Sequence, residues 1–152
     1  MESADVKLPT LLHGGQDVVL DTMVFIYLFE DDPTYGRPCE WLLRQIEAGT
    51  LTGIVTPVTA AELLVKPLQL NRPAVADQYR DALRSLPNVR MVATSPEVGF
   101  MAGALKAKYR LPLPDMIQVA TALELNSTAL ISNDKALQRI NEIKVVLLDS
   151  LI

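Results

Sequence analysis

The chain has 152 residues, of which 49% are hydrophobic, so it is long enough to bury one ordinary core without covalent cross-links. Its single cysteine, Cys39, excludes an internal disulfide framework, and no segment reaches the roughly 20 apolar residues that a membrane span requires. The 18 acidic and 14 basic residues give a net charge of −4, which argues against nucleic-acid binding through a broad basic surface.

Residues 1–16 contain Pro9, the pair Gly14-Gly15 and little periodicity, and are predicted to form an N-terminal extension. The early charges and the lack of an apolar stretch exclude a signal peptide, so we expect a cytoplasmic protein without a membrane partner. The only histidine, His13, falls in this extension and is interpreted as a loop residue. One histidine and one cysteine cannot form a zinc site. Residues 17–152 are predicted to form a single domain.

From residue 17 onward, short apolar segments alternate with helical patterns. Strands are predicted at residues 18–21, 51–56, 89–93, 128–131 and 144–148. Helices are predicted over residues 22–29, 35–48, 57–65, 71–86, 96–110, 115–125 and 135–140. Strands alternating with helices favour parallel pairing with right-handed crossovers, and hence an α/β fold with a mainly parallel sheet of about five strands.

The periodicity also predicts which helix faces are buried. The helix that ends at Leu86 is expected to bury Val75, Tyr79, Ala82, Leu83 and Leu86. The turns of the helix over 115–125 are expected to be defined by Ile117, Ala120, Thr121 and Leu123 or Glu124. Ser95 is predicted to cap the helix that Pro96 opens, and Cys39 is expected to pack in the core.

Four acidic residues occur at the same kind of position, where a predicted strand ends or the next helix starts. Asp21 ends the first strand, Glu62 and Asp115 lie early in later helices, and Asp134 follows the fourth strand. In a parallel sheet these positions open on one edge, so the side chains are expected to converge.

Each acid also has a local structural explanation. Thr59 and Glu62 have the spacing of a capping box, Asp115 could complement a helix dipole, and Asp134 could be an N-cap. Asp21 could be hydrogen-bonded at a strand end. These alternatives remain open at the level of the sequence.

If the four acids do converge, they cannot all ionise unaided, because like charges raise one another's pKa. Protons or a divalent cation must relieve the repulsion. Oxygen ligands without histidine or cysteine suit Mg²⁺ or Mn²⁺ rather than Zn²⁺. Such ions can bind a phosphodiester and activate water, which is the physical case for a metal-dependent nuclease.

Four blocks of the sequence resemble the signature blocks of PIN domains, and more narrowly the toxin ribonucleases of the VapC type. The blocks are Val18–Thr22, Thr59–Leu63, Leu113–Ala122 and Ile131–Lys135. The chain departs from many relatives at Met23, where they carry asparagine, and at Leu137, where they carry an aromatic residue.

The resemblance implies a three-layer α/β/α sandwich and cleavage of RNA with Mg²⁺ or Mn²⁺. It implies that Asp21, Glu62, Asp115 and Asp134 hold the metal, with Thr22, Ser132 and Asn133 in support. Ser132 and Asn133 would orient the last acid or a water molecule. A homodimer and a cognate antitoxin, whose tail enters the acidic groove, are also implied.

The resulting hypothesis is hydrolysis of an RNA phosphodiester to a 5′-phosphate and a 3′-hydroxyl, with Asp21 and Asp115 as direct metal ligands. Lys135, next to Asp134, is the preferred phosphate contact. The other candidates are Lys66, Arg72, Lys106, Lys108 and Arg110. One alternative is a PIN-like domain that binds RNA or protein with weak catalysis. Another is a phosphoryl-transfer domain of receiver or haloacid-dehalogenase type, which the absence of an acid at Met23 disfavours.

Overall fold

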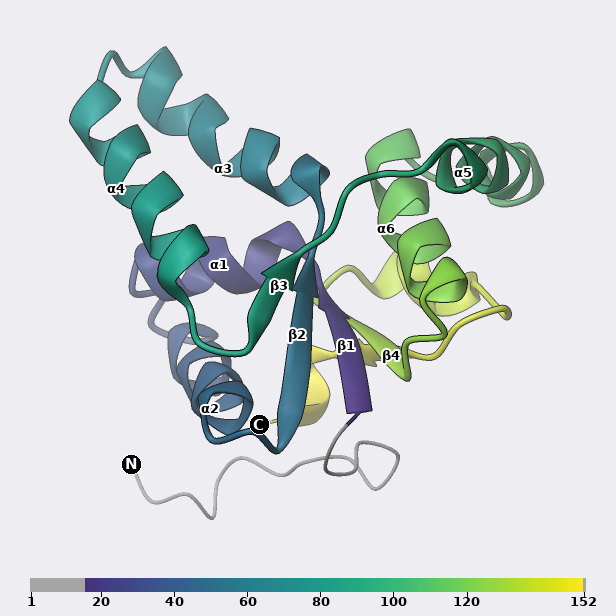
Figure 1. The fold of residues 1–152 in the computed structure, drawn as a ribbon, viewed down its shortest axis with the longest axis horizontal. Coiled ribbons are helices and arrows are strands. Elements are labelled where there is room, and N and C mark those ends of the chain that lie inside the picture. The colour runs from purple at the N-terminus through teal and green to yellow at the C-terminus, as the bar shows by residue number, and fades with distance from the viewer. Residues whose placement is uncertain (1–15, 152) are drawn as a thin grey trace.

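The computed structural model describes residues 16–151, so His13 and residues 1–15 of the predicted extension lie outside the described part of the chain. Within residues 16–151, helices cover both faces of one β-sheet (Figure 1). The strands are β1 (Gln16–Leu20), β2 (Leu51–Val55), β3 (Val89–Met91), β4 (Ala129–Ser132) and β5 (Val145–Leu147). The helices are α1 (Thr22–Phe29), α2 (Gly36–Glu47), α3 (Pro57–Gln69), α4 (Pro73–Ser85), α5 (Pro96–Tyr109) and α6 (Leu113–Glu124), with the 3₁₀ helices η2 (Lys135–Arg139) and η3 (Leu148–Leu151).

The strand order is β3-β2-β1-β4-β5, and every neighbouring pair is parallel. From the central strand β1 the chain proceeds to β2 and β3, and it then crosses to β4 and β5 on the other side. The direction of winding therefore reverses between β1 and β4. In open parallel sheets, ligands bind outside the carboxyl ends of the strands at such a reversal.

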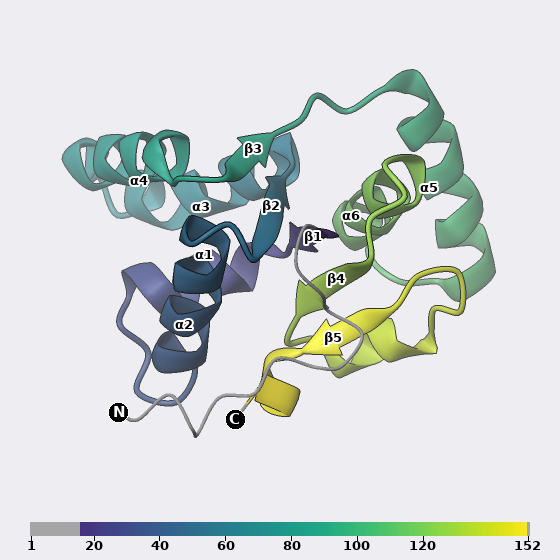
Figure 2. The same ribbon diagram turned by 60° about the horizontal axis from the view of Figure 1, so that its bottom comes forward.

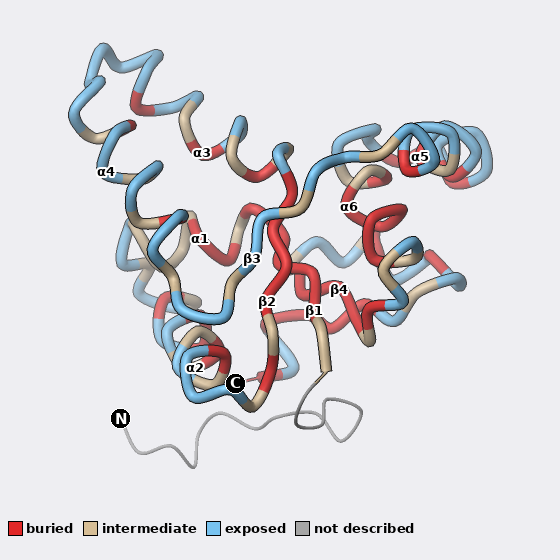
Figure 3. The backbone as a smooth tube through the Cα atoms, in the orientation of Figure 1, coloured by how far each residue is buried: buried red, intermediate tan, exposed pale blue. Residues whose placement is uncertain are grey.

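The side chains of the apolar run Val18–Leu20 pack against helices on both faces of the sheet. Val18 and Leu20 pack in a core with α1, α2, α3 and α4, whereas Val19 packs in a second core with α5 and α6. Figure 2 shows these two groups of helices on opposite sides of the sheet, and Figure 3 shows β1, β2 and β4 buried between them. Because successive strand residues point to opposite faces, a strand covered on both sides is apolar throughout. The predicted three-layer α/β/α fold with five parallel strands is confirmed.

Several predicted boundaries were wrong by a few residues. The largest error concerns α3, which was predicted to end at residue 65 but continues to Gln69. Pro67 lies buried inside the helix, and its carbonyl accepts the Arg72 amide at 2.8 Å. A proline this close to the end removes one hydrogen bond of the last turns without breaking the helix. Gln16, assigned to the extension, is the first residue of β1.

The predicted buried faces of two helices also need correction. In α4 the buried residues are Ala76 and Leu83, while the other predicted positions are only half-buried. In α6 the buried set is wider than one stripe: Met116, Gln118, Val119, Ala120, Thr121 and Ala122. A wide face is needed because α6 packs against both α5 and the sheet (Figure 1).

Cys39 is buried in the core, as predicted. Burial, together with the charge of Asp32, raises the pKa of its thiol to about 12, so the thiol stays protonated near neutral pH. Across the described chain, every helix is too short or too polar to traverse a lipid bilayer.

Candidate active site at the carboxyl edge of the sheet

Asp21 directly follows β1, where its amide donates to Ile131 O of β4 at 2.9 Å and its side chain caps α1. Its Oδ1 accepts the Thr22 amide at 2.8 Å, and its Oδ2 accepts the Ser132 hydroxyl at 2.7 Å. Only 6% of the residue is exposed. Burial raises the pKa of this carboxyl group; the bonds from Ser132 and Thr22 oppose the shift, and the charge of Glu62 adds to it. The fold therefore holds an acid at the switch point and stabilises its charged form with two donors.

Glu62 reaches the same edge from α3. Its Oε1 accepts the hydroxyl of Thr22 at 2.7 Å, and that hydroxyl also lies 3.0 Å from the Thr59 hydroxyl. The capping box considered for Thr59 and Glu62 does not form, because the N-cap of α3 is Thr56. With the helix starting at Pro57, Thr59 and Glu62 are one turn apart on the face that meets α1.

Asp115 stands half-buried in the first turn of α6. Burial and the negative charges of Asp21, Asp134 and Glu62 raise the pKa of its carboxyl group to about 6. The charges of the other three predicted acids therefore reach the carboxyl group of Asp115, although the four come from different segments of the chain.

Asp134 is exposed directly after β4, and it caps the short helix η2. Its Oδ1 accepts the Ala136 amide at 3.0 Å, as the N-cap alternative predicted. Its own amide donates to the Ser132 hydroxyl oxygen at 3.1 Å, and the same hydroxyl donates to Asp21. Ser132 thus links the first acid of the sequence to the last.

Asn133 and two of the basic candidates make contacts away from the four acids. The Asn133 side-chain amide donates to the Tyr27 hydroxyl at 3.3 Å and makes no hydrogen bond to Asp134. Lys66 and Lys108 pair with acidic residues, Glu30 at 2.9 Å and Glu142 at 3.2 Å respectively. Lys135 is exposed beside Asp134 and forms no ion pair within residues 16–151.

The ligand atoms available at this edge suit Mg²⁺ or Mn²⁺, because all four side chains offer carboxylate oxygens. A cation would also relieve the repulsion that raises the pKa of Asp115. The geometry is open, however: among residues 16–151, no three acidic, histidine or cysteine side chains are gathered closely enough to form a ready-made metal site. The acids are thus near enough to influence one another's ionisation but do not form a closed ligand set.

Gln118 and Thr56, which lie next to this edge, were given no role on the basis of the sequence. Gln118, which is 1% exposed, accepts the Thr56 hydroxyl on Oε1 at 2.6 Å and donates from Nε2 to the Thr59 hydroxyl at 2.9 Å. A usable signal was the spacing, because Gln118 follows Asp115 by one helical turn within an otherwise apolar segment.

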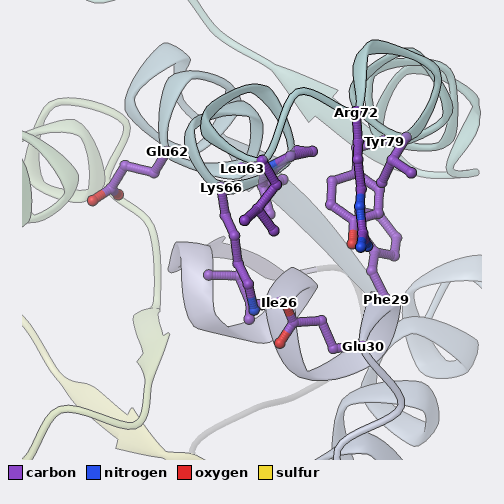
Figure 4. Close-up of a pocket in the computed structure, with 11 residues that line it drawn as sticks. Ile26, Phe29, Glu30, Glu62, Leu63, Lys66, Arg72 and Tyr79 are labelled. Carbon is purple, nitrogen blue, oxygen red and sulfur yellow. Dashed lines mark hydrogen bonds and ion pairs between the residues drawn. The ribbon is translucent and has the colours of Figure 1, made fainter.

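A groove between α1, α3 and α4 opens beside Glu62 and has a volume of about 340 Å³. Figure 4 shows that the Glu62 side chain points away from the interior of this groove, while Lys66 reaches toward Glu30 within it. Phe29 and Tyr79 stack in the groove with ring centroids 5.0 Å apart. Glu62 therefore lines this groove, while its carboxylate bonds to Thr22 beside Asp21.

The fold and the edge define a class: a three-layer α/β/α domain with a parallel sheet and carboxylates at the switch point. Within that class the family is identified by sequence, since residues 18–143 match the PIN domain, and the chain belongs to the PIN domain family. Among curated proteins, none matches the sequence.

Solved structures with the same fold include toxin–antitoxin complexes. The chain is similar to VapBC2 from Rickettsia felis, bound to a DNA fragment from its promoter, with a TM-score of 0.71 and 16% identity over 86% of this chain and 98% of that one. It is also similar to a toxin-antitoxin complex from Klebsiella pneumoniae, with a TM-score of 0.66 and 25% identity over 86% and 97% of the two chains. DNA-bound VapBC from Salmonella typhimurium gives a TM-score of 0.67 at 12% identity over 88% and 98%. The resemblance to VapC-type PIN domains noted in the sequence is thus confirmed at the level of the fold.

Proposed function

We propose that this PIN domain is a metal-dependent endoribonuclease and the toxin of a toxin–antitoxin pair. The observation that carries the proposal is the raised pKa of Asp115, because three other carboxylates contribute to it at the carboxyl edge of the sheet. Repulsion between neighbouring carboxylates is unfavourable unless a cation or a proton relieves it. The similarity to VapBC complexes supports the toxin part of the proposal.

In the proposed mechanism Asp21 and Asp115 would hold Mg²⁺ or Mn²⁺ directly, and Glu62 and Asp134 would complete the site or hold its waters. The chemistry that such an ion would supply is charge neutralisation at a phosphate and a lowered pKa for water. Thr22 and Ser132 restrict the two oxygens of Asp21, and Thr22 restricts Glu62, so the ligands are oriented before substrate arrives. Lys135 would contact a phosphate of the RNA. Cleavage leaves a 5′-phosphate and a 3′-hydroxyl.

The test replaces Asp21 or Asp115 with asparagine and measures Mn²⁺-dependent cleavage of a fluorogenic single-stranded RNA. We expect each variant to lose at least about 100-fold in kcat/KM, because a ligand to the cation is removed. Asp77→Asn is the matched control, since Asp77 is exposed on α4 and pairs only with Arg80. Wild-type rates in both site variants would contradict the assignment. Mn²⁺ binding without turnover in the wild type would favour the alternative of a PIN-like binding domain.

The proposed partners are RNA, a cognate antitoxin and a second copy of the chain, all in the cytoplasm. The antitoxin follows from the VapBC neighbours. Phe100, on α5, is the most exposed large hydrophobic residue within residues 16–151, at 81%. Co-expression with any small neighbouring reading frame should give a complex in which RNA cleavage is suppressed, and sedimentation equilibrium should give a dimer for the free chain. A monomer at all concentrations would contradict the homodimer.

A further inference from the structure

The buried polar side chains of this protein are concentrated beside the acidic edge. Of the eight buried polar or charged residues within residues 16–151, six form one hydrogen-bonded set, and only Thr121 and Ser127 lie outside it. The six are Asp21, Thr22, Thr56, Thr59, Gln118 and Ser132. Polar groups are costly to bury, so a set confined to one place is expected to have a local purpose.

Part of this set is a series of hydrogen bonds in which every step from donor to acceptor leads toward Glu62. The Thr56 hydroxyl donates to Gln118 Oε1, and Gln118 Nε2 donates to the Thr59 hydroxyl oxygen. The hydroxyl hydrogen of Thr59 is then available for Thr22, which in turn donates its own to Glu62 Oε1. Because each hydroxyl has one hydrogen, the amide of Gln118 orients every bond after it toward Glu62.

This series of hydrogen bonds connects helices that lie on the two faces of the sheet. Gln118 comes from α6, which packs in one core, while Thr59 and Glu62 come from α3, which packs against the other. Thr56 stands between them, directly after β2. Gln118 also lowers the pKa of Asp21 and so opposes the effect of burial on that carboxyl group. Its amide therefore links α6, which carries Asp115, to α3, which carries Glu62.

We propose that Gln118 is a positioning residue, which acts through Thr59 and Thr22 to hold Glu62 with Oε1 restrained and Oε2 presented to the acidic edge. Glu62 is an exposed residue on a helix surface, where a glutamate otherwise samples several rotamers. Within residues 16–151, Oε1 is the only oxygen of Glu62 that receives a hydrogen bond. The consequence for catalysis rests on the proposed nuclease function, but the ordering of Glu62 does not.

The experiment breaks the series of hydrogen bonds at Thr59, which is fully buried and makes no contact that was assigned to substrate or metal. Thr59→Val keeps the shape and removes the hydroxyl, whereas Thr59→Ser restores it. Thr121→Val is the matched control, because Thr121 is also a buried threonine and its hydroxyl bonds only to Ile117 O of its own helix, at 2.7 Å. Gln118→Met is a second disruption, at the other end of the series.

The first measurement uses the metal-free protein and needs no activity. Side-chain NMR relaxation of ¹³C-labelled glutamate should show Glu62 ordered in the wild type, Thr59→Ser and Thr121→Val. In Thr59→Val and Gln118→Met its order parameter should fall to that of Glu97, which is exposed on α5. If Glu62 keeps its order in Thr59→Val, or already matches Glu97 in the wild type, the proposal is wrong.

The second measurement is calorimetric Mn²⁺ affinity together with RNA cleavage. We expect Thr59→Val to lose about tenfold or more in Mn²⁺ affinity or kcat, and Thr59→Ser to recover most of it. A purely structural role would lower the stability of Thr59→Val and Thr121→Val alike and leave both functional readouts unchanged. If the wild type cleaves no RNA, the nuclease proposal fails while the NMR comparison still tests the positioning role.

Discussion

At Asp115, burial and three nearby negative charges act on a single carboxyl group and raise its pKa from 3.8 to about 6. The folded state therefore binds this proton more tightly than the unfolded chain does. The sign follows from proton linkage: below about pH 4 the acid is protonated in both states and its charge costs no stability, the free energy of unfolding falls as the pH rises from about 4 to about 6, and above that the loss is complete.

Asp115→Asn should stabilise the metal-free protein at pH 7.5, because it removes a charge that the fold disfavours. We expect a gain of about 1 kcal/mol in the free energy of unfolding, after the full shift is reduced for the partial exposure of the group. The gain should disappear near pH 4, where the acid is protonated in both states. Urea unfolding at the two pH values measures it, and an equal effect at both would show that charge is not the cause. The same substitution should abolish cleavage, so stability and activity change in opposite directions.

At the level of single elements, α5 shows how a short polar signal sets the start of a helix. Ser95 was predicted to cap this helix, and its hydroxyl oxygen accepts the Val98 amide at 3.1 Å. The hydroxyl also donates to Glu124 at 2.8 Å, which ties the start of α5 to the end of α6. The cap therefore has a tertiary role as well as a local one.

Ser95→Ala should lower the free energy of unfolding by about 1 kcal/mol, because the Val98 amide loses its acceptor. Ser85→Ala is the control, since Ser85 is exposed in the last turn of α4 and bonds only to carbonyls of its own helix. Chemical denaturation of both variants gives the comparison. Equal effects in the two variants would mean that the Ser95 cap contributes nothing to stability.

At the scale of the whole molecule, we expect ion binding at the acidic edge to be coupled to folding, because its four acids come near one another only after β1, β4, α3 and α6 have assembled. A ligand that binds only the folded state raises its stability by mass action. The predicted ion should therefore stabilise the fold even without RNA.

With free Mn²⁺ at 100 times its dissociation constant, the free energy of unfolding should rise by about 2.7 kcal/mol. EDTA should reverse the gain, and the double variant Asp21→Asn with Asp115→Asn should show none. Thermal unfolding followed by circular dichroism is sufficient. A similar increase in the double variant would place Mn²⁺ binding elsewhere on the protein.

Much of the fold could be predicted from local patterns. The apolar run Val18–Leu20 indicated a strand covered on both faces, and the alternation of strands and helices indicated parallel pairing; both are confirmed. The errors fell where tertiary contacts override a local signal, as at Pro67, which is buried inside α3, and along α6, which is buried on more than one side.

For the candidate site, the sequence alone determined which acids follow strands and so which could meet, because the direction of a parallel sheet places strand ends on one edge. Only the tertiary structure decided how they are held. Thr22 contacts Glu62, 40 positions away, and Ser132 contacts Asp21 across 111 positions. Such hydrogen bonds depend on the packing of elements from both faces of the sheet, and no spacing along the chain encodes them. Gln118 is the clearest example. In the sequence it is one polar residue in an apolar helix, whereas in the fold its side-chain amide links α6 to Thr59 of α3.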